Sequence, residues 1–281
     1  MRVLTPRSLD EAFRMRADDE VVAMAGGTDL LVHWPVLPET RARTYLDLWG
    51  LEELAGLRWM EGWLELGAIA TYWDVVRDPR ANAELPILVE AARQVGAIQI
   101  QARGTWAGNV ANASPAADGV PVLMACDATV LLVSVRGGRE VPLDKFYHGY
   151  KEMDLEPDEL VTAIRIPRRA RPVQRFFKVG SRRAQAIAKV GLAIARSDDG
   201  WRVVAASVAP TVKRCPALEA RLDEGWTPGS PDALLPAIRA DVAPIDDLRS
   251  TAAYREGTMA RVLFHAWPGV DGEADRRSGG S

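Results

Sequence analysis

The spacing of hydrophobic and polar positions alternates along the chain between short apolar runs and stretches with helical periodicity. The apolar runs predict strands at 21–25, 44–48, 63–68, 129–135, 159–166, 173–179, 190–196 and 201–208. Helical spacing and capping residues predict helices at 8–16, 71–77, 86–95 and 116–125 and, after Pro216, a helical region that ends with a helix at 252–267. Turns at Gly137-Gly138 and Asp198-Asp199-Gly200 predict two hairpins. Strands and helices without a regular βαβ period favour an α+β fold over a doubly wound parallel sheet.

The chain is long enough to form two globular units. It has 281 residues, and single domains typically contain roughly 100 to 150. The composition changes at 168–172, where arginine and proline interrupt the strand pattern. We therefore predict a first domain at 1–168, a second domain at 172–267 and a flexible, glycine-rich and charged tail at 268–281. The arginines around this boundary either form a solvated loop or dock to an acidic partner; they are Arg165, Arg168, Arg169, Arg171 and Arg175.

The overall charge argues against a nucleic-acid-binding protein. The chain has 35 Lys and Arg against 38 Asp and Glu, so its net charge is −3, whereas proteins that bind nucleic acid usually carry a basic excess. No apolar run reaches the roughly 18 residues that a bilayer-spanning helix needs. The N-terminal residues also lack the apolar segment of a secretory signal. We expect a cytoplasmic protein without membrane insertion and without a nucleic-acid partner.

The residues that commonly bind metals are few and scattered. The two cysteines, Cys126 and Cys215, lie far apart, whereas a [2Fe–2S] cluster usually takes four cysteines. The three histidines, His33, His148 and His265, show no ligand-like spacing. We therefore expect no metal site in this chain, and this chain alone cannot hold an iron–sulfur cluster.

Two glycine-rich turns are the strongest candidates for a ligand-binding site. The first, AGGTDLL at 25–31, follows a predicted buried strand and leads into a helical stretch. The second, GTWAGN at 104–109, precedes a loop of small residues that ends at Asp118. Glycine lets the backbone approach a ligand closely, and free N–H groups in such turns bind phosphate. Two opposed turns could clamp a pyrophosphate. The alternative interpretation, that each turn is only a tight strand-to-helix connection without a ligand, remains open. Neither turn matches the Rossmann or P-loop pattern.

Five collinear stretches resemble the FAD-binding medium subunit of molybdenum hydroxylases, the family that includes the flavin subunits of carbon monoxide dehydrogenase and bacterial xanthine dehydrogenase. They are AGGTDLL (25–31), GAIATYWDVVRDP (67–79), RGTWAGNVANASPAADGVPVLMACDA (103–128), FYHGYKEMDLEPDELVTAIRIP (146–167) and FKVGSRRAQAIAKVGLA (177–193). The resemblance implies a two-subdomain FAD-binding fold of the vanillyl-alcohol-oxidase/PCMH type. FAD would lie extended between two α+β subdomains, with a smaller α+β C-terminal domain packed alongside.

The resemblance also implies which residues hold FAD. The first turn and the residues before it would bind the pyrophosphate; they are Ala23, Met24, Ala25, Gly26, Gly27, Thr28, Asp29 and Leu30. The second turn would contribute Thr105, Trp106, Ala107, Gly108 and Asn109. Asp118 would contact the sugar-alcohol chain of the flavin, and Val95 and Val161 would lie near the cofactor. Lys178 would lie near the flavin ring, where its charge favours the anionic reduced form. No side chain is expected to act as a catalytic acid or base.

Several of these residues also have purely structural interpretations. Asp118 could cap the helix that follows it, Lys178 could be a solvated strand residue, and the two valines could belong to the core. Many relatives carry glycine where this chain has Ala107. Because an alanine with positive φ costs roughly 1 kcal/mol, this alanine suggests a right-handed or extended backbone or an altered turn. The role of Trp106 is open between cofactor contact and core packing.

The family resemblance implies an oxidoreductase subunit that exchanges electrons with partner chains. A large partner would hold a molybdenum–pterin cofactor, and a small partner would hold [2Fe–2S] clusters, in a dimer of heterotrimers. Electrons would pass through the clusters to the flavin and then to NAD⁺, a quinone, another carrier or oxygen. Two alternatives remain open: a self-sufficient FAD-dependent oxidase or dehydrogenase, and a flavin-less subunit that only supports assembly.

Overall fold

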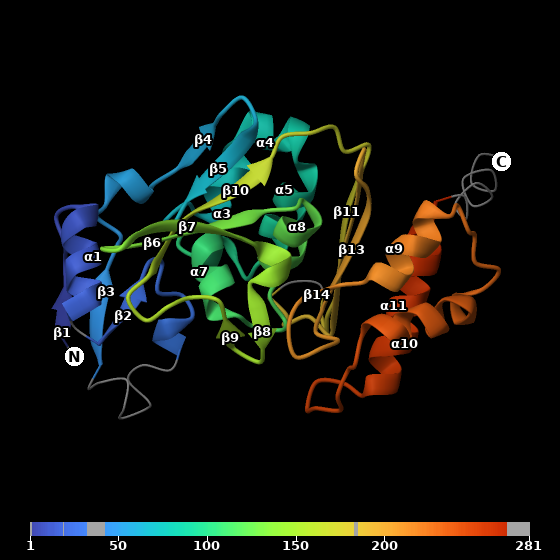
Figure 1. Ribbon diagram of the computed structural model, residues 1–281. Coiled ribbons are helices and arrows are strands. Elements are labelled where there is room, and N and C mark those ends of the chain that lie inside the picture. Colours follow the sequence, from blue (N-terminus) through green and yellow to red (C-terminus); the bar gives the residue numbers. More distant parts are fainter. Residues whose placement is uncertain (1, 19, 33–42, 183–184, 269–281) are drawn as a thin grey trace.

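The computed structural model describes residues 2–18, 20–32, 43–182 and 185–268. These residues form a three-stranded, a five-stranded and a four-stranded sheet and a two-stranded ribbon. Figure 1 shows the three larger sheets following one another along the molecule, with a group of helices beyond the last sheet. Helices mixed with largely antiparallel sheets confirm the predicted α+β class. Residues 269–281 of the predicted flexible tail lie outside the described residues.

The first subdomain contains a parallel sheet of order β1-β3-β2. Its elements are β1 (Arg2–Leu4), α1 (Leu9–Asp18), β2 (Val21–Met24), the 3-10 helix η1 (Leu30–Val32) and β3 (Thr44–Asp47). Helix α1 begins after Ser8, whose Oγ accepts a hydrogen bond from the Glu11 N–H at 3.2 Å, so the predicted capping residue is confirmed. Because β2 and β3 are parallel, their carboxyl ends lie at the same edge of the sheet. The first glycine-rich turn leaves the sheet at this edge.

The second subdomain is built on an antiparallel sheet of order β4-β5-β10-β6-β7. Its strands are β4 (Leu57–Trp59), β5 (Trp63–Gly67), β6 (Thr129–Ser134), β7 (Gly137–Pro142) and β10 (Leu160–Pro167), and β8 (Tyr147–Gly149) and β9 (Glu152–Met153) form the ribbon. Its helices are η2 (Glu52–Leu54), α3 (Tyr72–Arg77), α4 (Pro79–Glu84), α5 (Pro86–Gln94), α6 (Ile98–Gln101), α7 (Trp106–Asn112), α8 (Gly119–Ala125) and η3 (Leu143–Lys145). Helices α7 and α8 flank the loop that ends at Asp118.

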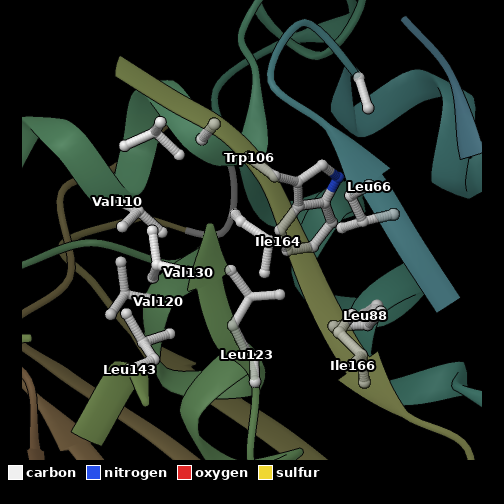
Figure 2. Close-up of a cluster of buried hydrophobic side chains, with 14 of the residues drawn as sticks. Leu66, Leu88, Trp106, Val110, Val120, Leu123, Val130, Leu143, Ile164 and Ile166 are labelled. Atoms are coloured by element: carbon white, nitrogen blue, oxygen red, sulfur yellow. The ribbon is translucent and has the colours of Figure 1, made fainter. Parts of the chain in front are cut away.

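The buried face of this sheet holds α7 and α8 in place. Along β6 the buried positions alternate with partly exposed ones, as expected for a strand with one face on the core. Figure 2 shows Val130 of β6 in one cluster with Leu123 of α8 and Ile164 of β10. Fully burying one such side chain contributes about 1.5–3 kcal/mol to stability. The loop between α7 and α8 is therefore attached at both ends to a well-packed core.

The structure adds a helix to the predicted set and shifts one turn. The predicted helix at 71–77 ends at Asp78, as its predicted bounds require. Asp78 also begins a further helix, α4, because its Oδ1 accepts a hydrogen bond from the Ala81 N–H at 2.6 Å and Pro79 occupies the first turn. The hairpin at Gly137-Gly138 is present, but Ser134 pairs with Gly137, so the turn consists of residues 135–136. Both glycines belong to β7. The second hairpin lies at the predicted place, since Ser197 pairs with Gly200.

The C-terminal part is a sheet of order β11-β12-β13-β14 covered by helices. The strands are β11 (Val173–Val179), β12 (Val190–Ser197), β13 (Gly200–Ala206) and β14 (Lys213–Arg214), followed by α9 (Pro216–Asp223), η4 (Pro231–Leu234), α10 (Leu235–Asp241) and α11 (Ala252–Ala266). Both faces of β12 are buried. Ala193 and Ala195 join the core of the preceding domain, whereas Leu192 and Ile194 join the cluster under the C-terminal helices. The alanine side chains on the first face let this sheet pack closely against the preceding domain.

The arginine run at the domain boundary is used inside the chain. Four of its five side chains form ion pairs or hydrogen bonds with other elements. At these four positions the run is therefore neither a freely solvated loop nor an open basic surface. The contacts join Arg165 to Glu65 and Glu140, Arg168 to Glu84, Arg169 to Asp127 and Asp199, and Arg171 to the carbonyl oxygen of Cys126.

Candidate functional site

The two glycine-rich turns lie against each other although they are far apart in the sequence. A Cβ atom added to Gly26 would lie 1.8 Å from the carbonyl oxygen of Arg103, so only glycine fits at this position. A Cβ atom added to Gly104 would lie 3.3 Å from Oγ1 of Thr28. The backbones of the two turns therefore touch, which is an arrangement that suits a clamp around one ligand.

The first turn has backbone donors that are free to bind a ligand. Gly27 has a φ of +71°, a left-handed conformation that glycine adopts at low cost. Its carbonyl oxygen accepts a hydrogen bond from the Leu31 N–H at 3.0 Å, where η1 begins. Among the described residues, none accepts a hydrogen bond from the N–H groups of Gly26, Gly27 or Thr28. Consecutive free N–H groups of this kind bind anions such as phosphate.

The second turn is the start of helix α7. Thr105 caps this helix, and its Oγ1 accepts a hydrogen bond from the Gly108 N–H at 3.0 Å. The Asn109 N–H donates to the carbonyl oxygen of Thr105, also at 3.0 Å. Ala107 lies inside the helix and has no positive φ, so alanine is unstrained at this position. No described residue accepts a hydrogen bond from the Ala107 N–H, which leaves this donor for a ligand.

The side chain of Trp106 belongs to the core. It is 0% exposed, and Figure 2 shows its ring beside Leu66 and Ile164. The ring also packs against Tyr72, with 4.8 Å between the centroids. The backbone N–H of Trp106 donates to the carbonyl oxygen of Ala70 at 3.2 Å, whereas the buried indole Nε1 has no hydrogen-bond partner among the described residues. Of the two interpretations left open by the sequence, the structure therefore favours core packing for this side chain.

Asp118 and Lys178 form an ion pair between the two domains. Asp118 directly precedes α8 and Lys178 lies on β11, and Nζ of the lysine is 2.6 Å from Oδ2 of the aspartate. Both side chains are largely buried, with 14% and 7% of their surfaces exposed. Asp118 makes no capping hydrogen bond to α8, and Lys178 is not a solvated strand residue. Both structural alternatives considered for these residues are therefore wrong.

The environment of Asp118 leaves one oxygen atom available. Its Oδ1 is buried and has no hydrogen-bond partner among the described residues. Burial raises the pKa of Asp118, and the adjacent ammonium group of Lys178 opposes this rise. A buried acceptor without a partner is costly, so Oδ1 suits a hydroxyl donor on a bound ligand.

Further contacts connect the remaining predicted residues. Oδ1 of Asn109 accepts a hydrogen bond from the Gly119 N–H at 3.1 Å, which ties the second turn to Asp118. Nζ of Lys178 also donates to the carbonyl oxygen of Gln94 at 2.9 Å, directly before Val95. Val95 is partly buried, whereas Val161 on β10 is 9% exposed and belongs to the core cluster. The structure thus brings the two turns, Asp118, Lys178 and Val95 into one connected region.

Sequence reasoning missed Arg103. Its guanidinium lies over the ring of Trp49, 3.7 Å from the centroid, and Trp49 follows β3 at the sheet edge where the first turn begins. In the described part of the chain, Arg103 has no hydrogen-bonded acid. The available signal was its position directly before the second turn. The stacking partner is more than fifty positions earlier in the chain and could not be inferred from spacing.

The described residues contain neither a metal-binding cluster nor a membrane-spanning helix. Within them, no group of three or more His, Cys, Asp and Glu side chains is arranged to hold a metal ion. No helix in this part of the chain combines the length and the hydrophobicity that crossing a membrane requires.

Comparison with known proteins identifies the family. Residues 1–169 match the family model described as FAD binding domain in molybdopterin dehydrogenase, and residues 175–270 match the CO dehydrogenase flavoprotein C-terminal domain. The chain is 31% identical over 273 residues to the nicotinate dehydrogenase FAD-subunit of Eubacterium barkeri, and the alignment covers 92% of each protein. It is 29% identical over 276 residues to the carbon monoxide dehydrogenase medium chain of Hydrogenophaga pseudoflava, covering 93% of this chain and 95% of the relative.

A solved structure shows the same fold. Carbon monoxide dehydrogenase from Hydrogenophaga pseudoflava, in a form that lacks the Mo-pyranopterin moiety of the molybdenum cofactor, contains a chain that matches with a TM-score of 0.86. The two chains are 28% identical, and the match covers 94% of this chain and 95% of that chain. The predicted FAD-binding fold, the FAD cofactor and the oxidoreductase class are confirmed by these matches. The chain belongs to the family of FAD-binding medium subunits of molybdenum hydroxylases.

Proposed function

We propose that this chain holds FAD between its two glycine-rich turns and relays electrons within a larger assembly. In this proposal, electrons come from a molybdenum–pterin cofactor on a large partner and pass through [2Fe–2S] clusters on a small partner. The chain then passes them to a terminal acceptor, which is NAD⁺, a quinone, another carrier or oxygen. Flavin suits this step because it accepts electrons one at a time and delivers them in pairs. The observation that carries the proposal is the direct contact between Gly26 and Arg103, which sets two turns with free N–H groups side by side.

The residues present fit the chemistry of FAD. The N–H groups of residues 26–28 and of Ala107 would bind the pyrophosphate, within the proposed segments 23–30 and 105–109. The unpartnered Oδ1 of Asp118 would accept a hydrogen bond from a hydroxyl of the sugar-alcohol chain. Lys178 would place a positive charge near the flavin ring, and Val95 and Val161 would border the cofactor. The protein thereby supplies binding, orientation and electrostatics rather than an acid or base.

The proposed partners follow from the relatives and from the cysteines. The Hydrogenophaga relative is named as a medium chain and the Eubacterium relative as a FAD-subunit, so both are parts of larger enzymes. Cys126 and Cys215 are both buried and belong to different core clusters, which fits iron–sulfur clusters on another chain. We propose a dimer of heterotrimers in the cytoplasm. The proposed domain division is 1–168 and 172–267, with the tail at 268–281.

Two other functions are less well supported. A self-sufficient flavin oxidase needs an acid–base residue over the flavin ring, and the proposed site offers only the Asp118–Lys178 pair, which is engaged internally. A flavin-less assembly subunit has no use for the unpaired N–H groups of residues 26–28 or for the buried Oδ1 of Asp118, which has no partner among the described residues.

The absorbance spectrum of the purified chain tests the proposal. Flavin bands, near-stoichiometric FAD identified by mass and no bound iron or molybdenum are expected. A colourless, folded protein that takes up no added FAD would leave only the assembly role. Bound iron or molybdenum would contradict the division of cofactors among the subunits.

A further inference from the structure

Among the described residues the last helix, α11, contacts the backbone of the C-terminal sheet through a buried arginine. Arg255 lies in the first turn of α11 and is 4% exposed. Its Nη1 donates to the carbonyl oxygens of Ser207, at 2.5 Å, and Lys189, at 3.3 Å. Its Nη2 is 2.7 Å from Oδ1 of Asp247. A buried guanidinium requires partners of this kind, so Arg255 is fixed in one position.

Ser207 is held in a strained backbone conformation. It follows β13 with a φ of +66°, in the left-handed region that residues other than glycine rarely adopt. All of its polar groups are engaged. Its N–H donates to the carbonyl oxygen of Pro115 at 2.7 Å, its Oγ donates to that of Ala188 at 2.9 Å, and its carbonyl oxygen accepts from Arg255. A strained conformation persists only where its surroundings hold it, so the bonds to Arg255 and Pro115 depend on each other.

Pro115 lies in the short loop between α7 and α8. The loop leaves α7 at Ala113, which has a φ of +49°, and reaches α8 at Asp118. Within it, the Ala117 N–H donates to the carbonyl oxygen of Ser114 at 3.1 Å, so the loop is compact. A displacement at Pro115 would therefore move Asp118 relative to Lys178, its ion-pair partner on β11.

We propose that Arg255 is a positioning residue for the flavin site. Through Ser207 it holds Pro115, and through Pro115 it sets the place of the Asp118 carboxylate. The last helix thereby takes part in cofactor binding without touching the cofactor. The inference rests on the proposed function, which places FAD beside this loop.

The test compares FAD affinity with stability in the full-length protein. Apo protein is titrated with FAD by fluorescence quenching well below the unfolding temperature, and the visible circular dichroism of the bound flavin is recorded. Arg255→Met should bind FAD at least tenfold more weakly than the wild type and alter the flavin dichroism. Leu263→Ala is the matched control, because Leu263 is 0% exposed in the same helix and packs only in the C-terminal core cluster. It should lower the unfolding temperature while FAD affinity stays near the wild-type value.

Two further variants separate positioning from general stability. Arg255→Lys keeps the charge and an N–H donor group, so it should recover part of the affinity. In a Ser207→Gly background the conformation at 207 is no longer strained, and Arg255→Met should therefore cost less affinity. The inference would be overturned if Arg255→Met bound FAD with wild-type affinity. If the methionine variant does not fold, wild-type FAD affinity in Arg255→Lys would overturn it instead. An equal loss in Leu263→Ala would overturn it as well. A wild-type protein that binds no FAD would refute the proposed function itself and remove the basis of this inference.

Discussion

Replacing Gly26 by alanine tests the contact between the two turns. The added Cβ would lie 1.8 Å from the carbonyl oxygen of Arg103 and 2.6 Å from its carbonyl carbon. Both are backbone atoms, so no side-chain rotation relieves the clash. Real Cβ contacts are essentially never shorter than 3.0 Å, so the two turns must separate by at least about 1.2 Å.

This separation gives the expected magnitude. An N–H···O bond to a phosphate spans about 2.9 Å, and it is lost when one turn moves away by more than 1 Å. Losing one hydrogen bond to a charged group costs about 1.5–3 kcal/mol, and each 1.4 kcal/mol is tenfold in affinity. Gly26→Ala should therefore weaken FAD binding by about 10- to 100-fold. Overpacking of this kind lowers the stability of the protein by about 1–3 kcal/mol.

The assay is a fluorescence titration of apo protein with FAD, together with thermal unfolding. Gly62→Ala is the control, because a Cβ at Gly62 would meet nothing within 4 Å and this glycine has no positive φ. The control should bind FAD as the wild type does. A folded Gly26→Ala protein with wild-type affinity for FAD would refute the clamp geometry.

Three other substitutions test single residues of the site. Gly27→Val should abolish FAD retention while circular dichroism shows a folded protein. The reason is that Gly27 has a φ of +71° and that Cδ1 of Leu31 lies 3.3 Å from the added Cβ. Tight FAD binding by this variant would count against the clamp. Arg103→Met should weaken FAD binding and leave riboflavin binding unchanged. The guanidinium has no ion-pair partner in the described part of the chain, and of the two ligands only FAD carries phosphates that it could bind. Equal losses of affinity for both ligands would contradict a phosphate contact. Lys178→Met should lower the free energy of unfolding by about 3 kcal/mol at pH 8, because it leaves Asp118 buried without its cation. Without the lysine the already raised pKa of Asp118 rises further. The loss of unfolding free energy should therefore be smallest near pH 4, about the ordinary pKa of an aspartate, and should grow as the pH rises. A loss that does not change with pH would contradict the assignment of the ion pair.

The elements that the sequence predicted are those whose own residues determine their structure. β12 and β6 each contain a continuous apolar run, so the local pattern identified both strands. β1 and β4 have three residues each and were missed. Arg2 pairs with Thr44, and Leu57 pairs with Leu66, so these short strands depend on partners that local periodicity does not reveal. Helix α4, which begins at Pro79, was missed because Asp78 both ends the preceding helix and caps this one.

The site was predictable as a set of segments but not as a geometry. Glycine patterns and family resemblance identified both turns. The 1.8 Å approach at Gly26, the stacking of Arg103 on Trp49 and the pairing of Asp118 with Lys178 all join segments that only the folded chain brings together. Trp106 shows that a motif alone does not assign a side chain to the ligand, because a residue inside a binding motif can have its side chain packed in the core.

The boundary between the two domains runs through the proposed flavin site rather than beside it. Lys178, on the first strand of the C-terminal sheet, is the cation paired with Asp118 of the preceding domain, and Ser207 of the same sheet holds the loop before Asp118. The first domain alone would therefore keep both glycine-rich turns but lose the cation that pairs with Asp118. Small side chains on β12 let the sheet approach closely enough for these contacts. We therefore expect the contacts of Lys178 and Ser207 with the first domain to be a condition for an intact cofactor site, and substitutions that break these contacts to weaken FAD binding.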